Sequence, residues 1–345
     1  SDKQHDENID YKVWTDKGWA DIKRVIKHKT NKKIYEILTH TGCVRVTSDH
    51  SLLDIKGNQL KPNECKIGTE LLHNTLIIEN KKLDFKINQN ELDKSYIYGF
   101  FFGDGSCGKY GEKIKTKYSW ALNNKDMELN KKLIKKLNNI YPDDNFKILN
   151  TIKSSNVYKI VPSCGNIKKF VIEYRDKFYD KDKHKIIPNE ILNGTKEQKE
   201  NFLEGYYAAD GCRCDTEKSN CHRFDVKGQI SALNLYQLVT SLNYKVSINK
   251  RKDKPEIFRL TYSSNNNKFR KNPNKIKKIT ELGITDNYVY DLETNIGHFH
   301  AGVGSMIVKN TDSVFFTPKI HDIVTKEIKT HRAALRVSIE IGILA

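Results

Sequence analysis

Two apolar stretches, residues 96–105 (YIYGFFFGDG) and 202–211 (FLEGYYAADG), dominate the hydrophobic pattern of this chain. Each predicts a helix that has two small residues four positions apart and that ends in Asp-Gly. Such a helix has one face without large side chains, where a second backbone can come very close. We expect the two helices to pack on each other along these faces. The small residues are Gly99 and Gly103 in the first stretch and Gly205 and Ala209 in the second.

The segments after the two stretches repeat the same order of elements. Thr195 and Gln198 predict a capping box at the start of the second helix, and the first helix starts near Asn90. Each stretch is followed by a predicted strand, residues 116–123 or 223–231, and then by an amphipathic helix. The recurring order of motif, strand and helix indicates a duplicated unit. The apolar faces of the amphipathic helices carry Leu129, Leu133, Ile134 and Leu137 in the first unit and Leu235, Leu238, Val239 and Leu242 in the second. Further strands are expected at residues 157–162, 245–249 and 257–262.

The chain before the first helix has the pattern of short antiparallel strands. Residues 11–54 alternate between apolar and polar positions and are broken by turn residues, and Val44 and Val46 alternate with Arg45 and Thr47. Residues 68–72 (GTELL) begin another predicted strand. Together with the helices, these strands predict an α+β protein.

Asp104 and Asp210 end the two apolar helices, so the predicted packing brings them side by side. Both lie near a helix C-terminus, where the helix dipole disfavours an anion, and two neighbouring carboxylates also repel each other. A cation would relieve both effects. A divalent metal ion between two carboxylates is a usual arrangement for activating water against a phosphodiester. The alternative is two buried helices whose Asp-Gly ends are ordinary turns.

Residues 97–105 and 203–211 resemble, position by position, the paired motifs of LAGLIDADG homing endonucleases. The resemblance implies a pseudo-symmetric αββαββα domain, a monomer, that cuts both strands of duplex DNA with Mg²⁺ or Mn²⁺ held by Asp104 and Asp210. Residues 185–192 (KIIPNEIL) resemble the block that precedes the second motif in intein-borne members. Its Lys185 matches a lysine that approaches the active centre in the family, where a cation can stabilise developing charge.

The formal net charge of +17 favours a polyanionic partner, because neutralising phosphates releases counterions. A compositional bias of the genome toward Lys and Asn codons is an equally good explanation of the charge alone. Basic residues interleaved with aromatic ones on the predicted strands of the repeat are candidates for contacts with double-stranded DNA. These candidates are Lys113, Lys115, Lys117, Lys227, Lys245, Arg251 and Arg259, with Lys250 beside them.

The seven cysteines have irregular spacing, which does not resemble a secreted disulfide framework. Cys212, Cys214, Cys221 and His222 have the residue types of a zinc site, but the Cys-x-Cys spacing is poor for structural zinc. No apolar run is long enough to cross a bilayer, and the start of the chain has no signal-peptide core. We therefore expect a soluble intracellular protein, in the cytoplasm, the nucleus or a viral factory, with no membrane partner.

The outer segments resemble a second family, the self-splicing inteins. Thr47 and His50 match its Thr-x-x-His pattern, in which these residues polarise the upstream scissile peptide bond. Residues 287–310 resemble the last two intein blocks and end in Asn310, which is followed by Thr311. The resemblance implies that the Asn310 carboxamide attacks its own carbonyl carbon and that the Thr311 hydroxyl accepts the upstream segment. The matched residues that would activate these groups are Asp291, His298 and His300.

Two features depart from the intein pattern. Lys309 stands where inteins commonly have a histidine, and lysine is a poor proton shuttle unless its pKa is lowered. The start of the chain does not resemble the first intein block, so we expect the N-terminal splicing block to be missing from this sequence, and Ser1 is only a formal candidate for the first nucleophile. Either a block histidine substitutes for the residue at 309, or Asn310 cyclises slowly.

Residues 311–316 (TDSVFF) resemble the second half of a metal-binding motif of family B DNA polymerases, with Asp312 as the matching acid. Residues 331–345 resemble the polymerase helix that follows. Known hosts of inteins at this position include archaea and large DNA viruses, and the Lys/Asn bias leans toward a virus.

These observations predict an incomplete, mostly-β Hint-type splicing domain with an inserted LAGLIDADG endonuclease. The predicted divisions are residues 1–80 (splicing domain, first part), 81–270 (endonuclease), 271–310 (splicing domain, second part) and 311–345 (polymerase C-extein). The predicted function is metal-dependent cutting of both strands of an uninterrupted polymerase gene. One alternative is a DNA-binding module that no longer cuts. Another is the larger part of a split intein, completed by an N-terminal segment from a second polypeptide.

Overall fold

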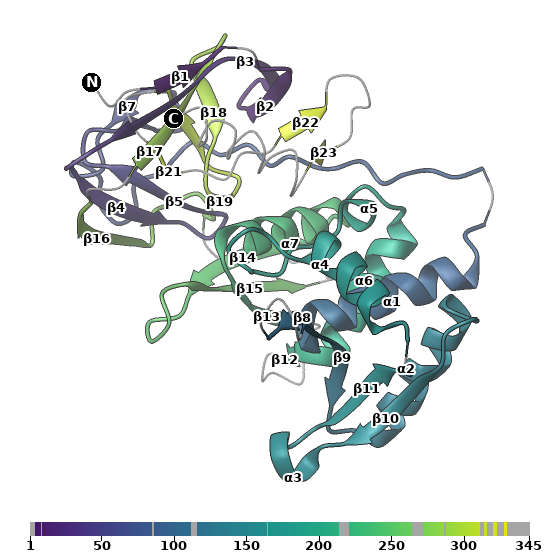
Figure 1. Cartoon of the computed structure of the whole chain (residues 1–345). Coiled ribbons are helices and arrows are strands. Elements are labelled where there is room, and N and C mark those ends of the chain that lie inside the picture. The colour runs from purple at the N-terminus through teal and green to yellow at the C-terminus, as the bar shows by residue number, and fades with distance from the viewer. Residues whose placement is uncertain are drawn as a thin grey trace. The chain divides into compact units, whose positions relative to one another are not determined.

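The computed structural model describes residues 4–7, 9–84, 86–111, 116–163, 165–213, 221–263, 272–285 and 288–310, and the backbone of the segments 314–315, 320–322 and 328–329. The chain divides into two compact units, which are described separately. Unit 1 consists of residues 1–78, 219–221 and 225–345, and unit 2 of residues 79–218 and 222–224. The structure is mixed α and β, as expected (Figure 1).

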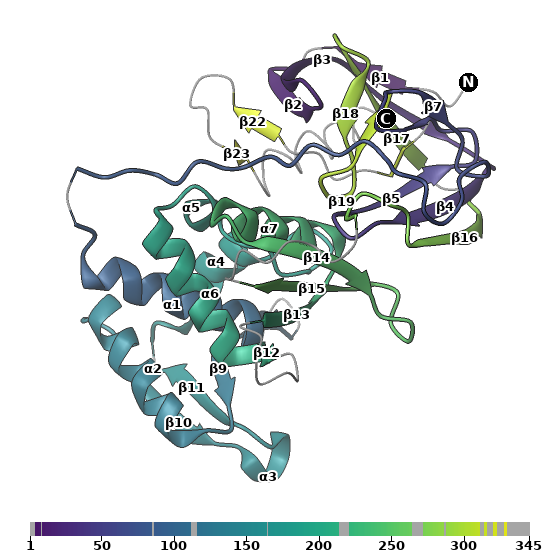
Figure 2. The same cartoon turned by 180° about the vertical axis from the view of Figure 1, so that it is seen from behind.

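Unit 2 contains the first repeat, whose elements follow the order α-β-β-α-β-β-α apart from the short helix α3. Its four strands form one antiparallel sheet in the order β10-β11-β9-β8, and helix α2 packs on β9, β10 and β11 (Figure 2). The elements are α1 (Gln89–Asp104), β8 (Gly105–Tyr110), β9 (Lys117–Asn124), α2 (Met127–Ile140), β10 (Phe146–Asn150), α3 (Ile152–Ser155), β11 (Tyr158–Pro162), α4 (Ile167–Phe178), α5 (Asn189–Leu192) and α6 (Lys196–Asp210).

The second repeat starts with α6 and continues in the same order of elements as the first. Its strands are connected in the order β12-β13-β15-β14, which is the strand order of the first sheet when strands are numbered within each repeat. The shared strand order supports the duplication predicted from the motifs. The elements after α6 are β12 (Cys212–Arg213), β13 (Cys221–Lys227), α7 (Gln229–Ser241), β14 (Lys245–Lys250) and β15 (Ile257–Ser263).

One predicted strand in this repeat is too long. The strand expected over residues 223–231 ends at Lys227, because Gly228 has φ +90° and helix α7 starts at Gln229. A positive φ breaks the extended backbone, and glycine adopts it without a Cβ clash. The polar residues after Gly228 therefore belong to a helix and not to the strand.

Helices α1 and α6 pack backbone to backbone, as predicted (Figure 1). A Cβ atom added to Gly99 would lie 1.8 Å from the carbonyl oxygen of Phe202, and one on Gly205 would lie 2.0 Å from that of Tyr96. No side chain fits at either position. The capping box of Thr195 and Gln198 is also present at the start of α6.

The core of unit 2 beside α1 is aromatic. Phe101 of α1 stacks on Trp120 of β9, with ring centroids 5.9 Å apart, and its ring also contacts Tyr174 and Phe178 of α4. All four side chains are buried. The spacing of Phe170, Tyr174 and Phe178 is helical, so α4 carries the apolar face that encloses this cluster.

Unit 1 contains the β-rich ends of the chain in a large sheet with the order β16-β4-β5-β21-β17-β3-β2-β22-β23. The antiparallel strands predicted over residues 11–54 are present: β2 with β3, and β4 with β5. The strand expected at residues 68–72 is absent, and Glu70 and Leu71 form only isolated bridges. The strands are β1 (Gln4–Asp6), β2 (Tyr11–Thr15), β3 (Gly18–Lys29), β4 (Lys33–Leu38), β5 (Gly42–Thr47), β16 (Lys278–Ile284), β17 (Tyr288–Thr294), β19 (Val303–Gly304), β21 (Val314–Phe315), β22 (Ile320–Asp322) and β23 (Ile328–Lys329).

A smaller sheet of unit 1 joins segments from the two ends of the chain in the order β18-β20-β6-β7. The buried core between the sheets includes Val44, Val46, Leu52, Phe299 and Val308. Its strands are β6 (Leu52–Leu53), β7 (Gln59–Leu60), β18 (His298–His300) and β20 (Ile307–Lys309). Within the described part of the chain, no helix combines the length and the apolar character that a membrane crossing requires.

Candidate functional site

Asp104 and Asp210 lie together at the adjoining ends of α1 and α6. At the level of Gly103, an added Cβ would be 2.7 Å from the Cβ of Ala209 and 3.3 Å from the Cβ of Asp210. The close packing that starts at Gly99 and Gly205 thus continues to the last turn of both helices. Asp104 is half-buried and Asp210 is exposed, so the pair opens to solvent on the α6 side.

The glycine after each acid has the same steric role in both repeats. A Cβ on Gly105 would lie 2.1 Å from the ring of Phe101, and one on Gly211 would lie 2.1 Å from the ring of Tyr207. Each aromatic ring covers the helix end from one turn before, and the chain leaves in an extended conformation. The Asp-Gly pairs therefore fix where the two carboxylates leave their helices.

The carboxyl of Asp104 is in an unfavourable place for a charge. Burial, together with the negative charge of Asp210, raises its pKa to about 6, and the ammonium of Lys185 opposes this rise. Carboxylate oxygens are ligands that Mg²⁺ and Mn²⁺ prefer, and a cation between the two acids would relieve their repulsion. The donor set and its electrostatics fit a divalent metal ion.

Lys185 closes the C-terminus of α1. Its Nζ donates hydrogen bonds toward the carbonyl oxygens of Phe101 (2.8 Å), Phe102 (3.2 Å), Gly103 (2.8 Å) and Gly105 (2.6 Å). The first three carbonyls belong to the last turn of α1, where the Phe101 carbonyl also accepts from the Gly105 backbone N–H, and a cation at this end complements the helix dipole. Burial lowers the pKa of Lys185 to about 8, against the charges of Asp104 and Asp210. Lys185 therefore positions the end of α1 beside the acids.

A short turn before Lys185 holds it in place. Asp180 and His184 close the turn: the Asp180 backbone N–H donates to the His184 carbonyl at 3.0 Å, and the Asp180 carboxylate accepts from the His184 backbone N–H at 2.7 Å. Tyr179 and Lys185 form a bridge across it. The side chains of Asp180, Asp182 and His184 place three potential metal-ligand atoms within 4.8 Å of one another. Since Asp180 is already used by the turn, we assign this group to the support of Lys185.

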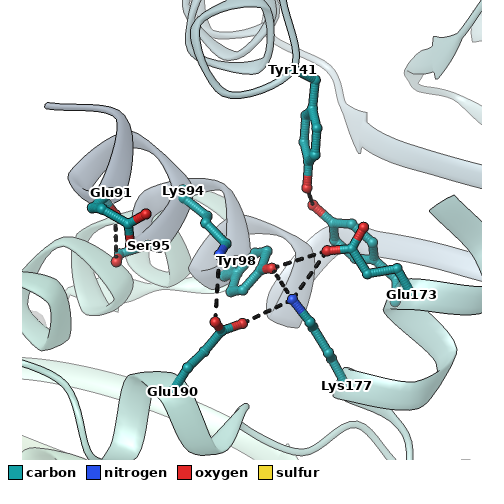
Figure 3. A network of polar contacts seen from close by, with 9 residues as sticks. Glu91, Lys94, Ser95, Tyr98, Tyr141, Glu173, Lys177 and Glu190 are labelled. Carbon is teal, nitrogen blue, oxygen red and sulfur yellow. Dashed lines mark hydrogen bonds and ion pairs between the residues drawn. The ribbon is translucent and has the colours of Figure 1, made fainter. Parts of the chain in front are cut away.

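A polar network that the sequence did not predict fixes α1 to α4 and α5 (Figure 3). The ammonium of Lys177 lies 2.8 Å from the Tyr98 hydroxyl and 3.1 Å from both Glu173 and Glu190. Lys94 of α1 reaches Glu190 at 3.4 Å. Tyr98 is fully buried, and burial raises the pKa of its hydroxyl well above the ordinary value. A buried tyrosine inside an apolar motif, with Glu and Lys at helical spacing elsewhere, is the only sequence signal of this network.

The predicted DNA-binding residues differ in how available they are. Lys117, Lys227 and Lys245 are exposed on the strands of the two repeat sheets. Arg259 instead makes a two-pronged contact with Asp225, at 2.8 and 2.9 Å, and Arg251 pairs with Asp225 and Asp253. The neighbouring Lys250 is paired with Glu36 and almost fully buried. Lys113 and Lys115 lie outside the described residues.

In unit 1 the Thr-x-x-His segment and the end of the predicted splicing element meet, although they are far apart in the sequence. The segment runs from β5 into β6, which pairs with β20 through Leu52 and Val308. The Lys309 backbone N–H donates to the Ser51 carbonyl at 3.2 Å. Asn310 follows directly, and its backbone N–H donates to the Gly297 carbonyl at 2.9 Å.

The remaining splicing candidates of unit 1 differ in their burial and hydrogen bonds. Thr47 and His50 are buried, and burial lowers the pKa of His50 to about 3, so its ring is neutral at neutral pH. Asp291 is buried in β17, where it accepts from the Leu292 backbone N–H at 2.8 Å.

The two block histidines have distinct environments. His300 is fully buried, with Nε2 2.7 Å from the Gly304 carbonyl, and so closes the turn between β18 and β19. His298 keeps partial exposure, and its Nδ1 lies 3.1 Å from the carboxylate of Asp16. Thr311, Asp312, Ser1, Cys214 and the side chain of Cys212 lie outside the described residues, so the zinc and polymerase predictions remain predictions.

No family model matches the chain. The chain is 55% identical over 338 residues to a protein named DNA polymerase from Acanthamoeba polyphaga mimivirus, a match that covers 96% of this chain and 19% of that protein. A DNA polymerase from Thermococcus hydrothermalis is 28% identical over 207 residues, covering 56% of this chain and 12% of that protein. Transcription initiation factor IIB of Methanocaldococcus jannaschii is 26% identical over 309 residues, a match that covers 84% of this chain and 40% of that protein. The chain spans less than half of the length of each relative.

Among solved structures, the homing endonuclease I-DmoI in complex with DNA and Mn superposes with a TM-score of 0.39 at 16% sequence identity, over 51% of this chain and 91% of that one. The homing endonuclease I-WcaI bound to its DNA recognition sequence gives a TM-score of 0.32 at 14% sequence identity, over 52% of this chain and 78% of that one.

Proposed function

We propose that this chain contains a site-specific DNA endonuclease that makes metal-dependent double-strand cuts. The observation that carries the proposal is the convergence of Asp104 and Asp210 at the ends of two duplicated helices that touch backbone to backbone. Holding these two acids together is unfavourable without a cation, because burial and the charge of Asp210 both raise the pKa of Asp104.

The chain's own residues would divide the work at this site. Asp104 and Asp210 would hold Mg²⁺ or Mn²⁺, which when bound supplies charge neutralisation and an activated water for phosphodiester hydrolysis. Lys185 keeps the end of α1 in place and adds a positive charge within reach of both acids. The network around Tyr98 and Lys177 holds the middle of the same helix.

The two repeat sheets would carry the DNA. Each presents exposed lysines, among them Lys117, Lys227 and Lys245, on antiparallel strands. Strand pairs of this kind can enter a DNA groove, and basic side chains on them contact phosphates or base edges. Asp225 pairs with Arg259 and Arg251 on the second sheet and so restrains the orientation of their guanidinium groups.

We further propose that the endonuclease is inserted in an intein within a family B DNA polymerase. The chain matches proteins named DNA polymerase and also a protein named transcription initiation factor IIB. A segment shared by proteins of such different names is more simply an inserted element than part of either activity. The meeting of Ser51, Gly297 and Asn310 in unit 1 supports a splicing junction at Asn310. The divisions at residues 80, 270 and 310 belong to this proposal.

The test is incubation of the purified chain with a plasmid that carries the uninterrupted polymerase gene, with and without Mg²⁺. We expect one double-strand cut that needs the metal and disappears with a chelator. A matched plasmid without the gene serves as the control. Binding without any cut, over a range of Mg²⁺ and Mn²⁺ concentrations, would instead support the DNA-binding module that no longer cleaves.

A further inference from the structure

Asp16 and His298 form a pair beside the proposed splicing junction. The Nδ1 of His298 lies 3.1 Å from Oδ1 of Asp16, and both side chains are largely but not fully buried, with exposed fractions of 21% and 18%. The two residues come from distant parts of the chain, the turn between β2 and β3 and the start of β18. No sequence pattern singled out Asp16, which lies in a region predicted only to form strands.

The turn that carries Asp16 is held on both sides. The Thr15 hydroxyl donates to the Gly18 carbonyl at 2.7 Å, and the Lys17 backbone N–H donates to the Thr15 hydroxyl at 3.1 Å. The side-chain amide of Asn74 donates to the Thr15 carbonyl at 2.7 Å. Asp16 is therefore presented to His298 by a fixed hairpin end.

His298 in turn lies next to Asn310. Strands β18 and β20 place His298 directly opposite Lys309, and Asn310 is hydrogen-bonded to Gly297, the residue before His298. The side-chain oxygen of Asn310 lies 3.2 Å from the position that a Cβ on Gly297 would take. The Asn310 side chain thus folds back toward the start of β18.

The other candidates for a proton shuttle are less suited to this junction. Lys309 carries an amine, which is a poorer proton shuttle than an imidazole. The Nε2 of His300 is used by the Gly304 carbonyl, and His300 is fully buried. Of these two histidines, only His298 is partly exposed, and it lies beside Asn310.

We propose that Asp16 is a positioning residue for cleavage at Asn310, acting through His298; this inference rests on the proposed splicing function. The Asp16 carboxylate holds the proton of His298 on Nδ1 and leaves the lone pair of Nε2 available as a base. It also stabilises the imidazolium that forms when Nε2 takes up a proton.

The reaction balances without water or a further reactant. The Asn310 Nδ2 forms a bond to the Asn310 carbonyl carbon and gives one proton to Nε2 of His298. The bond between that carbon and the Thr311 nitrogen breaks, and the leaving amine takes the proton from Nε2. The products are a C-terminal succinimide on one chain and a free amine at Thr311 on the other.

The experiment follows release of residues 311–345 from the full chain by mass spectrometry. We expect Asp16→Asn to slow release by at least about tenfold, which is part of the rate enhancement that an acid–base group such as His298 typically contributes. Asp16→Glu should restore most of the rate. Lys17→Ala, in the same turn but exposed, should release at the parent rate. Adding Asp16→Asn to a His298→Gln chain should cause no further loss, because the two residues act through one imidazole.

A second measurement reports the pair without release. In the Asn310→Ala chain, labelled histidine NMR should show His298 protonated on Nδ1, and Asp16→Asn should change that signature. A parent chain that releases nothing would refute the splicing proposal and the role of Asp16 with it. Normal release by Asp16→Asn, or additive losses in the double variant, would overturn the role of Asp16 alone.

Discussion

The contact between α1 and α6 leaves no room for a methyl group, and this can be tested with Gly205→Ala. The added Cβ would lie 2.0 Å from the Tyr96 carbonyl oxygen and 3.1 Å from the Phe100 nitrogen, whereas ordinary contacts begin near 3.4 Å. Both neighbours are backbone atoms, so no flexible side chain can move aside. The helices must separate by roughly 1.4 Å at this point, because packed interiors hold little free space.

The size of the effect follows from two opposing terms. Overpacking costs about 1–3 kcal/mol, and a clash between two backbones belongs at the upper end of this range. Alanine is a better helix former than glycine by about 1 kcal/mol, which offsets part of the cost. The net destabilisation is therefore about 2 kcal/mol, which corresponds to roughly thirtyfold faster exchange of amides that open with these helices.

The assay is hydrogen exchange of α1 and α6 read by mass spectrometry, together with chemical denaturation. Glu204→Ala is the matched control, because Glu204 is the exposed neighbour of Gly205 on the same helix. It should change the stability by less than about 0.5 kcal/mol. Unchanged exchange in Gly205→Ala, or a rise in stability from the added helix propensity, would refute the backbone contact.

Three further predictions concern other parts of the molecule. Lys177→Met should destabilise unit 2 by about 1–3 kcal/mol in chemical denaturation, because it leaves two carboxylates and a buried tyrosine hydroxyl without their shared cation. Lys131→Ala removes an exposed ion pair and should cost less than about 0.5 kcal/mol in the same experiment. Burial lowers the pKa of His50 to about 3, so between pH 6.5 and 3 only the unfolded chain binds a proton at His50, and the free energy of unfolding falls as the pH drops through this window. Between pH 7.5 and 5.5, the free energy of unfolding of His50→Asn should therefore fall by about 1 kcal/mol less than that of the parent. Lys117→Ala should weaken DNA binding and make the logarithm of affinity less steep against the logarithm of salt concentration by about one unit, and an unchanged slope would remove Lys117 from the phosphate contacts.

The repeat could be predicted from the sequence because its signals are local. Small residues at helical spacing, the capping box at Thr195 and the two Asp-Gly ends each follow from a few neighbouring residues. Alternating residues likewise predicted β2 to β5. The errors are local too: Gly228 ended a strand earlier than expected, and residues 68–72 form isolated bridges to Asp54 and Lys275 in place of a strand.

The supports of the candidate sites could not be predicted, because they join residues that are distant in the sequence. The resemblance pointed to Lys185 as a cation near the acids, but its four contacts with the end of α1 depend on the turn closed by Asp180 and His184. Helix α4 was missed, although Phe170, Tyr174 and Phe178 have helical spacing. The pairing of Arg259 with Asp225 depends on the register of β13 and β15, which no local pattern fixes.

The most direct test of the account is cutting and binding by Asp104→Asn and Asp210→Asn on the uninterrupted gene. Both substitutions keep the size of the side chain and remove one carboxylate charge from the proposed metal site, whereas protein–DNA contacts in general are mostly to the phosphate and sugar backbone. The account predicts that each variant binds the DNA with nearly the parent affinity and makes no double-strand cut in Mg²⁺. Cutting at the parent rate by either variant would contradict the claim that the two aspartates share one catalytic metal site.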